Sequence, residues 1–251
     1  MKLNTRENRL KLLNTLWWIP DKQMISLQFR LAMKQKLNFL DLNTFNEKLQ
    51  WLKLYDHNPL HTKMVDKYRV RTIIEEKIGE NYLIPLLGHW ERYEDIDFEK
   101  LPSQFVLKCN HDSGSIRIVY DRTSIDHDEM NKFFSQRLKQ NPYRYGREWP
   151  YKNVHPCIIA EEYMGDGKVL PADYKFFCFD GFVDSVMICT GRGFSEKRFF
   201  FFDKEWRLRK YNKSSQTLPD DYQLEKPQGI DELFSLAKVI YLLRTGKILK
   251  D

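Results

Sequence analysis

The sequence lacks any apolar run long enough to cross a membrane. The segment Leu12–Ile19, LLNTLWWI, is apolar but much shorter than the roughly 20 residues that a spanning helix needs. The first residues carry no apolar segment followed by a small-residue cleavage site, so no signal peptide is predicted. We therefore expect a cytoplasmic protein with at most peripheral membrane contact. A helix packed on the protein body is the interpretation that we favour for Leu12–Ile19.

The sequence also lacks the short motifs of several large enzyme classes. It contains no GxxxxGK[ST] loop, no GxSxG turn and no HExxH pair. Its four cysteines form no CxxC pair. We assign no metal ligand, and the free cysteines are typical of a reducing cytoplasm.

The composition is that of a folded protein. Hydrophobic residues make up 42% of the 251 residues and charged residues 30%, which disfavours disorder. The net charge of +6 is compatible with an anionic ligand, such as a nucleotide, or simply with a basic surface. No run of Arg and Lys with interleaved aromatic residues dominates the chain, so we do not expect nucleic acid as a partner.

The hydrophobic periodicity divides the chain into a helical part and a mixed part. Residues 1–82 are predicted to be helical, with a capping box formed by Thr44 and Glu47 and a helix from Lys63 to Lys77. Short β-type runs then alternate with turns and a few helices, and Asp180-Gly181 predicts a tight hairpin. The expected later elements are strands over 104–109, 116–120, 157–164, 173–179 and 183–189, and helices over 128–140 and 230–243.

Three groups of residues have the chemistry of an anion or nucleotide site. The first is Lys108 with the turn that follows it. A lysine at a strand end, next to a flexible turn, can place an ammonium group and several backbone N–H groups around one phosphate. The turn residues that we select are Asn110, Ser113, Gly114 and Ser115. Taken alone, this pattern favours a plain β-hairpin with a surface lysine, because glycine is common in turns.

The second group ends the apolar strand Ile158-Ile159-Ala160. Glu161 and Glu162 come directly after it and are followed by Tyr163 and Met164. If this strand leads into a hinge, Glu161 is placed to accept a hydrogen bond from an adenine amino group. Solvated acids at an exposed strand end are the alternative.

The third group lies on the predicted strand that begins at Asp173. Side chains alternate across a strand, so Asp173 and Lys175 share one face, and that face can be directed at phosphate. An edge strand with one wet face has the same pattern. Arg192, between two glycines, can reach an anion or serve as an ordinary turn residue.

The order and the amino-acid sequence of these groups resemble those of the TupA-like ATP-grasp family, which is named for teichuronopeptide synthesis. The resemblance extends from about Asn43 to about Lys238 and rests on several collinear stretches. These stretches are NTFNEKLQWLKLYDHNP, MVDKYRVRTIIEEKIGENYLIPLLG, LPSQFVLKCNHDSGS, IIAEEYMGDG, DYKFFCFDG and RFFFFDKEW.

The resemblance implies an α+β, ATP-grasp-like fold with two lobes that bind ATP and Mg²⁺. We assign the helical region to 1–82, the first lobe to 83–157 and an incomplete second lobe to 158–251. Lys108 is then expected to contact the ATP phosphates, with the loop from Asn110 to Ser115 as a lid. The same reasoning directs Glu161 at adenine, Tyr163 and Met164 at the edge of its ring, and Lys175 at the nucleotide.

The resemblance also implies an ATP-dependent ligase that activates a carboxylate as an acyl phosphate for attack by an amine. The expected substrates are acidic or amine-bearing sugars or peptides of capsule, teichuronopeptide or other surface-polysaccharide pathways, and proteins of such a pathway are expected partners.

The acidic motifs that hold magnesium in the family find no match in the last residues, Val239–Asp251, so we expect either an ATP-dependent ligase or a truncated remnant of one, and the sequence leaves open whether it is active. Two alternatives stay open, a non-catalytic binding protein of the same pathway and a glycosyltransferase. Asp126 and Asp128 have the DxD spacing that a glycosyltransferase uses, but they lie at an expected helix start.

Overall fold

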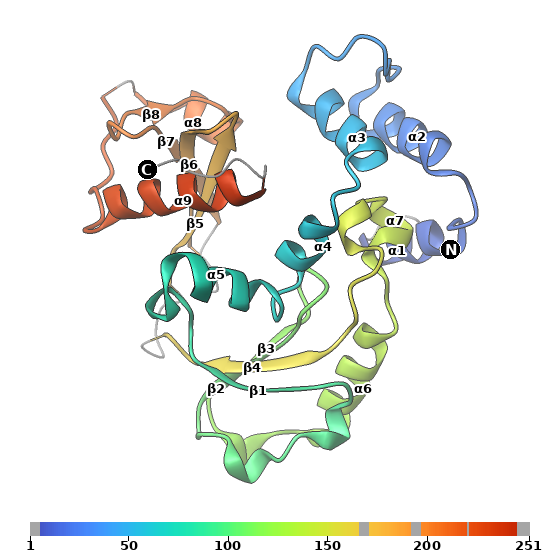
Figure 1. Ribbon diagram of the computed structural model, residues 1–251, viewed down its shortest axis with the longest axis vertical. Coiled ribbons are helices and arrows are strands. Elements are labelled where there is room, and N and C mark those ends of the chain that lie inside the picture. The colour runs from blue at the N-terminus through green and yellow to red at the C-terminus, as the bar shows by residue number, and fades with distance from the viewer. Residues whose placement is uncertain (1–5, 166–170, 192–196, 220, 245–251) are drawn as a thin grey trace. The chain divides into compact units, whose positions relative to one another are not determined.

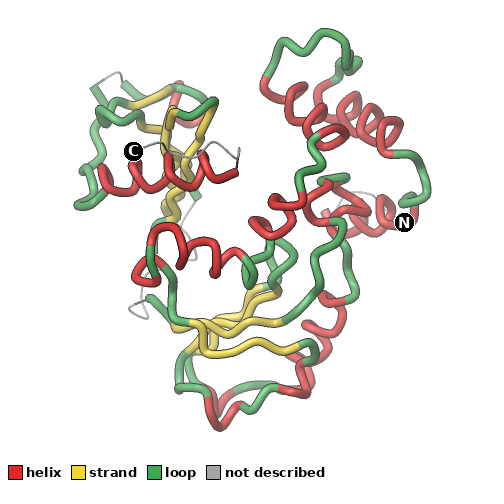
Figure 2. Tube along the Cα trace, in the orientation of Figure 1, coloured by secondary structure: helices red, strands yellow, loops and turns green. Residues whose placement is uncertain are grey.

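The computed structural model describes residues 6–165, 171–191, 197–219 and 221–244. The chain forms two compact units, one made of Met1–Ile73 and Pro85–Glu162, the other of Ile74–Ile84 and Tyr163–Asp251. Each unit contains one antiparallel sheet of four strands together with helices (Figures 1 and 2). The α+β class predicted from the sequence is therefore confirmed.

Helices dominate the first 80 residues, as the periodicity predicts. In α2 the buried side chains are Met24, Ile25 and Phe29, and the last two form a small core with Leu37. Thr44 and Glu47 form the predicted capping box at the start of α3. The helices in this part are α1 (Arg6–Thr15), α2 (Asp21–Met33), α3 (Phe45–Tyr55), α4 (Pro59–Val65) and α5 (Val70–Ile78).

The single helix predicted from Lys63 to Lys77 is wrong, because the chain breaks between α4 and α5. Asp66 causes the break. Its Oδ1 accepts hydrogen bonds from the backbone N–H groups of Tyr68, at 2.9 Å, and Arg69, at 3.2 Å. A short acidic side chain that bonds nearby backbone donors competes with helix continuation and favours a new helix start.

The sheet of the first unit has the strand order β1-β4-β2-β3, and every neighbouring pair is antiparallel. Its strands are β1 (Leu86–Trp90), β2 (Phe105–Cys109), β3 (Ile116–Val119) and β4 (Ile158–Glu162). The central strands β4 and β2 are paired with Leu107 opposite Ala160 and with Lys108 opposite Ile159. Because side chains alternate along a strand, these two pairs lie on opposite faces of the sheet.

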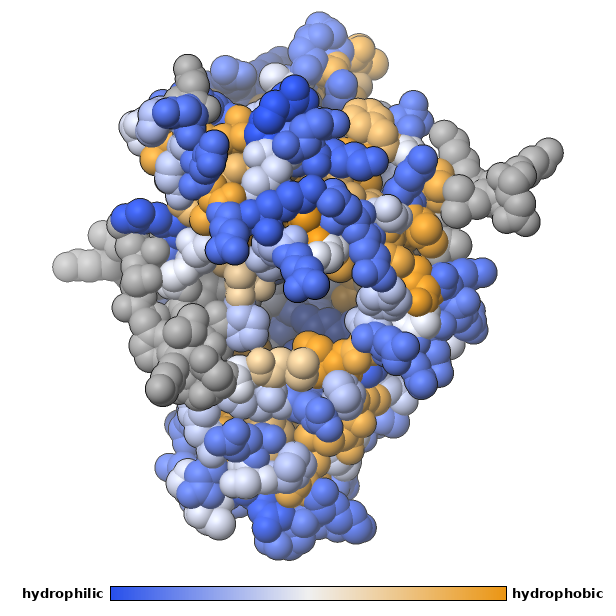
Figure 3. All heavy atoms as spheres, turned by 90° about the vertical axis from the view of Figure 1, so that its left-hand side faces the viewer, coloured by the Kyte–Doolittle hydropathy of each residue, from blue (hydrophilic) through white to orange (hydrophobic). Residues whose placement is uncertain are grey.

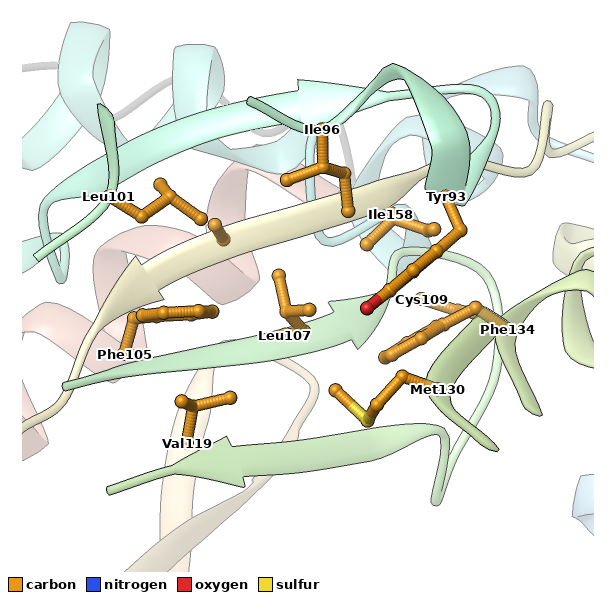
Figure 4. Packing of buried hydrophobic residues seen from close by; sticks show 11 residues of the cluster. Tyr93, Ile96, Leu101, Phe105, Leu107, Cys109, Val119, Met130, Phe134 and Ile158 are labelled. Atoms are coloured by element: carbon orange, nitrogen blue, oxygen red, sulfur yellow. The ribbon is translucent and has the colours of Figure 1, made fainter. Parts of the chain in front are cut away.

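One face of this sheet carries the main hydrophobic core of the first unit. Phe105, Leu107 and Ile158 have no exposed surface and pack with Met130 and Phe134 of α6 (His127–Leu138). Figure 4 shows Phe134 and Met130 reaching from the helix toward Leu107. Asp126 caps the start of α6 by accepting a hydrogen bond from the backbone N–H of Glu129, at 2.9 Å.

The other face of the sheet is polar at its centre. Lys108 and Glu161 project from this face, and the start of α5 supplies Arg71, whose Nη1 lies 3.4 Å from Glu161. The sheet therefore separates an apolar core on one side from a charged group on the other.

The second unit contains the remaining strands in sequence order. Its strands are β5 (Asp173–Phe179), β6 (Phe182–Thr190), β7 (Arg198–Phe202) and β8 (Leu208–Arg209). The long helix α9 (Ile230–Arg244) packs on this sheet, with the ring centroids of Phe176 and Phe234 at 5.1 Å. The predicted hairpin is confirmed: Asp180 and Gly181 both have positive φ and join β5 to β6.

Short elements connect these main ones. They are the helices α7 (Pro142–Gly146) and α8 (Lys213–Gln216) and the 3₁₀ segments η1 (Glu80–Tyr82), η2 (Tyr93–Asp95), η3 (Phe98–Lys100), η4 (Arg122–Ser124) and η5 (Trp149–Tyr151). On the face shown in Figure 3, hydrophilic residues are interspersed with smaller groups of hydrophobic ones. None of the described helices has the length and apolar character needed to cross a membrane.

The compact units differ from the sequence-based division at 157/158 in one respect that concerns the site. Strand β4 stays in the first unit because it is hydrogen-bonded to both β1 and β2. Directly after β4 ends at Glu162, the chain passes into the second unit at Tyr163.

Candidate functional site

Lys108 and Glu161 form an ion pair on the polar face of the first sheet. Lys108 Nζ bonds Glu161 Oε2, and Arg71 Nη1 lies 3.4 Å from Glu161 Oε1. We expected the lysine and the glutamate on separate lobes, but they lie on adjacent strands of one sheet. Only 7% of the Glu161 side chain is exposed, against 22% for Lys108 and 15% for Arg71.

This group of three leaves one positive charge in excess. A buried carboxylate is costly unless it is paired, and here two cations offset its desolvation. The pairing also orders the long side chains of Lys108 and Arg71, which are otherwise expensive to fix in one conformation. The arrangement can hold a partly exposed ammonium group in place for an anion.

The loop after β2 is divided between buried and exposed residues. Ser113 and Gly114 are exposed, and Gly114 has φ +109° with no atom within 4 Å of the position that a Cβ would occupy. Asn110 and Ser115 are buried. Of the four loop residues selected from the sequence, two are therefore open to a ligand and two are part of the protein interior.

Asn110 has a structural role in this loop. Its amide Nδ2 donates to Asp66 Oδ1 and to the carbonyl of His155, both at 2.9 Å, and its Oδ1 accepts from the backbone N–H of Cys157 at 2.8 Å. These bonds use both N–H donors of the side chain and one of the two lone pairs of its oxygen. They tie the loop to the segment before α5 and to the segment before β4.

Lys67 holds the backbone of this loop by hydrogen bonds to its carbonyl groups. Its ammonium group donates to the carbonyls of Cys109, at 3.2 Å, and Asn110, at 3.3 Å, and also to that of Asp112. Burial lowers the pKa of Lys67 below its usual value, while the nearby Asp112 raises it in part. With these carbonyls directed at one cation, the loop has a fixed backbone on which Ser113 and Gly114 are displayed.

Two further buried groups lie in the same loop. Burial lowers the pKa of His111, whose Nε2 lies 3.1 Å from the carbonyl of Gln140. Asp112 Oδ2 accepts a hydrogen bond from Ser115 Oγ. His111 Nδ1 and Asp112 Oδ1 have no hydrogen-bond partner among the described residues.

The neighbouring cysteines are inert in this environment. Burial raises the pKa of both Cys109 and Cys157 to about 12, and all four cysteines are free. At neutral pH these two thiols stay protonated and act as small apolar side chains.

The residues after Glu161 lie where the chain leaves the first unit. Glu162 is exposed, and its backbone N–H donates to the carbonyl of Pro85 at 3.1 Å. Tyr163 is half-buried, and Met164 is 59% exposed. The strand thus leads out of one compact unit and into the other, as a hinge position requires.

The remaining predicted residues belong to the second unit. Lys175 Nζ bonds Asp173 Oδ2, which confirms that the two share one face of β5. That face is opposite the one on which Phe176 packs against α9. Arg192 lies outside the described residues.

Sequence reasoning missed Lys67 and Arg71, which contact the site from the segment around the start of α5. Their signal in the sequence is weak, because each is one basic residue in a stretch rich in Lys and Arg. Asp66 lies between α4 and α5 and also holds Asn110, and the sequence analysis had placed it inside the single helix expected over 63–77.

The sequence model of the family described as TupA-like ATPgrasp matches residues 47–242, which is most of the chain. This chain belongs to the TupA-like ATP-grasp family. The match includes every candidate residue named above. No curated protein matches the chain.

Membership in the TupA-like ATP-grasp family makes the chain an ATP-grasp ligase-like protein. Within the residues that the structure describes, no group of three or more His, Cys, Asp or Glu side chains is arranged to hold a metal ion. We therefore assign no protein ligand to Mg²⁺.

Proposed function

We infer that this protein binds ATP and uses it to join a carboxylate to an amine in the biosynthesis of a surface polysaccharide. One observation carries this inference for the chain itself. The ammonium group of Lys108 is held by Glu161 on the polar face of the sheet, and the exposed turn at Ser113 and Gly114 follows the same strand, in a chain that belongs to an ATP-grasp family.

The turn suits a phosphate for two physical reasons. Gly114 has no Cβ, so a ligand can approach the backbone closely, and the backbone N–H groups of a turn form a natural cradle for an anion. Lys108 adds a point charge from the adjacent strand. Asp112 opposes anion binding, but Lys67 lies close enough to offset its charge.

Glu161 fits a positioning role better than direct contact with adenine. Both of its oxygens already accept from cations, Oε1 from Arg71 and Oε2 from Lys108. We therefore propose that Glu161 orients Lys108. We also propose that Tyr163 and Met164, which follow Glu161, contact the edge of the adenine ring. Contact of Asp173, Lys175 and Arg192 with nucleotide stays a prediction.

ATP supplies the phosphoryl group that activates a carboxylate, and Mg²⁺ is the expected counter-ion of its phosphates. This chain's residues contribute binding and charge neutralisation, which dominate catalysis of phosphoryl transfer. The resemblance to proteins of capsule and teichuronopeptide pathways supports an acidic or amine-bearing sugar or peptide as substrate, and proteins of such a pathway as partners.

Calorimetric titration of the full chain tests this proposal against the two alternatives. The probes are an ATP analogue with a non-hydrolysable β–γ bridge and UDP-glucose, each with and without Mg²⁺. We expect binding of the ATP analogue, strengthened by Mg²⁺, and none of UDP-glucose. The opposite preference favours a glycosyltransferase, and no binding of either at millimolar concentration refutes the nucleotide site.

A further inference from the structure

The positive charge of this protein is concentrated at its N-terminal end. The first 46 residues contain eight Lys and Arg against three Asp and Glu, whereas the other 205 residues contain 33 against 32. The family match begins at residue 47. The basic segment therefore precedes the family-matched part, and the proposed nucleotide site does not explain its charge.

The same segment exposes large apolar side chains. Of 21 large hydrophobic residues exposed among those described, eight lie between Leu12 and Phe45. Trp18 is 68% exposed and Leu31 62%, and Leu40 is almost fully in solvent. Single exposed apolar residues are common on protein surfaces, but so many within one short and basic stretch point to a binding surface.

Helix α2 shows how apolar and basic residues are combined. Its buried face carries Ile25 and Phe29. At 100° per residue, the opposite face carries Leu27, Arg30 and Leu31, and all three are exposed, as is Lys34 directly after the helix. A helix with one packed face and one outer face of mixed leucine and basic residues suits contact with a charged amphipathic surface.

We propose that residues 8–40 form a surface that attaches the protein to bilayers rich in anionic lipid. Charge complementarity selects this partner, because an anionic leaflet attracts clustered Lys and Arg by about 1 kcal/mol each. Tryptophan favours the interface between headgroups and acyl chains, since its ring is apolar and its N–H is polar. Trp17 and Trp18 lie in the turn between α1 and α2, a position from which side chains can enter that interface.

Contact with Arg144 does not bury Trp17. The guanidinium carbon of Arg144 lies 5.6 Å from the Trp17 ring centroid, yet this tryptophan stays 57% exposed. The side chains proposed to contact lipid are therefore accessible in the folded protein. This proposal is independent of nucleotide binding and survives even if the proposed function fails.

Sedimentation with vesicles tests the proposal directly. The full chain is mixed with vesicles of equal parts phosphatidylglycerol and phosphatidylcholine, or of phosphatidylcholine alone, at about 0.1 M and about 0.5 M salt. We expect sedimentation only with the anionic vesicles, and several-fold weaker binding at the higher salt, where the Debye length falls to less than half. Equal binding to both vesicle types, or binding to neither, overturns the proposal.

Paired variants locate the surface. Trp18→Gln with Leu31→Gln is expected to weaken vesicle binding about tenfold or more, since each loses a large apolar group. Arg30→Gln with Lys36→Gln is expected to weaken it about 25-fold, at about fivefold for each charge. The matched controls are Phe182→Thr, an exposed aromatic residue in β6, and Lys204→Gln with Arg198→Gln, and these are expected to bind normally.

A fluorescence measurement separates lipid contact from misfolding and from self-association. Brominated lipid is expected to quench the tryptophan emission of the unaltered chain more than that of the Trp18→Gln variant. The unfolding temperature of the variant is expected to be unchanged, which would exclude misfolding as the cause. Two results would contradict the proposal. One is equal quenching in both proteins. The other is that the protein does not bind vesicles and instead forms a concentration-dependent dimer, which Trp18→Gln abolishes.

Discussion

At the scale of single residues, Asn110 decides the shape of the candidate phosphate loop. Its side chain joins Asp66, the carbonyl of His155 and the backbone N–H of Cys157, three groups from separate segments. Asn110→Ala leaves buried donors and acceptors without partners, and we expect it to lower the free energy of unfolding by about 2–4 kcal/mol. Urea unfolding measures this loss.

Ser113→Ala is the matched control for that measurement, because Ser113 lies in the same loop but is exposed. It is expected to change stability by less than about 0.5 kcal/mol. Similar losses in the two variants would show that the loop is not held by the Asn110 side chain.

His111 gives the second prediction at this scale. Burial lowers its pKa in the folded protein below the usual value of 6.5, so the unfolded chain binds the proton more readily. The free energy of unfolding must then fall as the pH drops below about 6.5, and His111→Gln should reduce this loss. Urea unfolding at pH 7.5 and pH 5 measures the difference.

The comparison for His111 is His155→Gln, because His155 is largely exposed. It is not expected to reduce the acid-induced loss of stability. If His111→Gln and the wild-type protein lose the same stability between the two pH values, His111 is not the group responsible.

The sequence predicted the chemical types at this site better than their roles. Lys108 and the exposed pair Ser113 and Gly114 were identified from a strand end followed by a flexible turn. Asn110 was assigned to the ligand because a polar loop residue looks the same whether it faces solvent or the interior. Only the fold shows that Asp66 and Cys157 surround it.

At the scale of elements, local signals predicted the structure well wherever a backbone conformation demands a particular residue. The hairpin between β5 and β6 places Gly181 at φ +89°. Gly181→Ala puts a Cβ into the left-handed region and should cost about 1–2 kcal/mol of stability. Thermal or urea unfolding measures this cost.

The control for that prediction is Gly146→Ala in α7, where φ is not positive and the added Cβ would meet only the Glu148 side chain, at ordinary contact distance. It is expected to be neutral or slightly stabilising. The interpretation of the hairpin is wrong if Gly181→Ala is tolerated as well as Gly146→Ala.

Elements were predicted wrongly where a tertiary contact competes with local preference. The apolar periodicity continues across the break between α4 and α5, so it indicated one helix from Lys63 to Lys77. Asp66 ends that pattern because its buried carboxylate accepts from Asn110 and from the backbone N–H of Tyr68 in the turn between the two helices. A capping box such as that of Thr44 and Glu47 is local in sequence and was therefore predictable.

At the scale of the whole molecule, the family resemblance gave the fold class, and the family model confirms it. The pairing of strands was not predictable, because no local pattern in the sequence shows which strands become neighbours when they are far apart along the chain. For this reason Glu161 was expected on a second lobe, although β4 pairs with β2 and brings Glu161 to Lys108.

The central claim is that Lys108 holds the phosphates of ATP, and calorimetric titration of two lysine variants with the ATP analogue and Mg²⁺ tests it most directly. Lys108→Ala should raise the Kd about 10- to 100-fold, since a charge-assisted hydrogen bond contributes about 1.5–3 kcal/mol. Lys100→Ala, which changes a lysine exposed by 84% in the same unit, should leave it unchanged. An unchanged Kd for a folded Lys108→Ala variant would contradict the account.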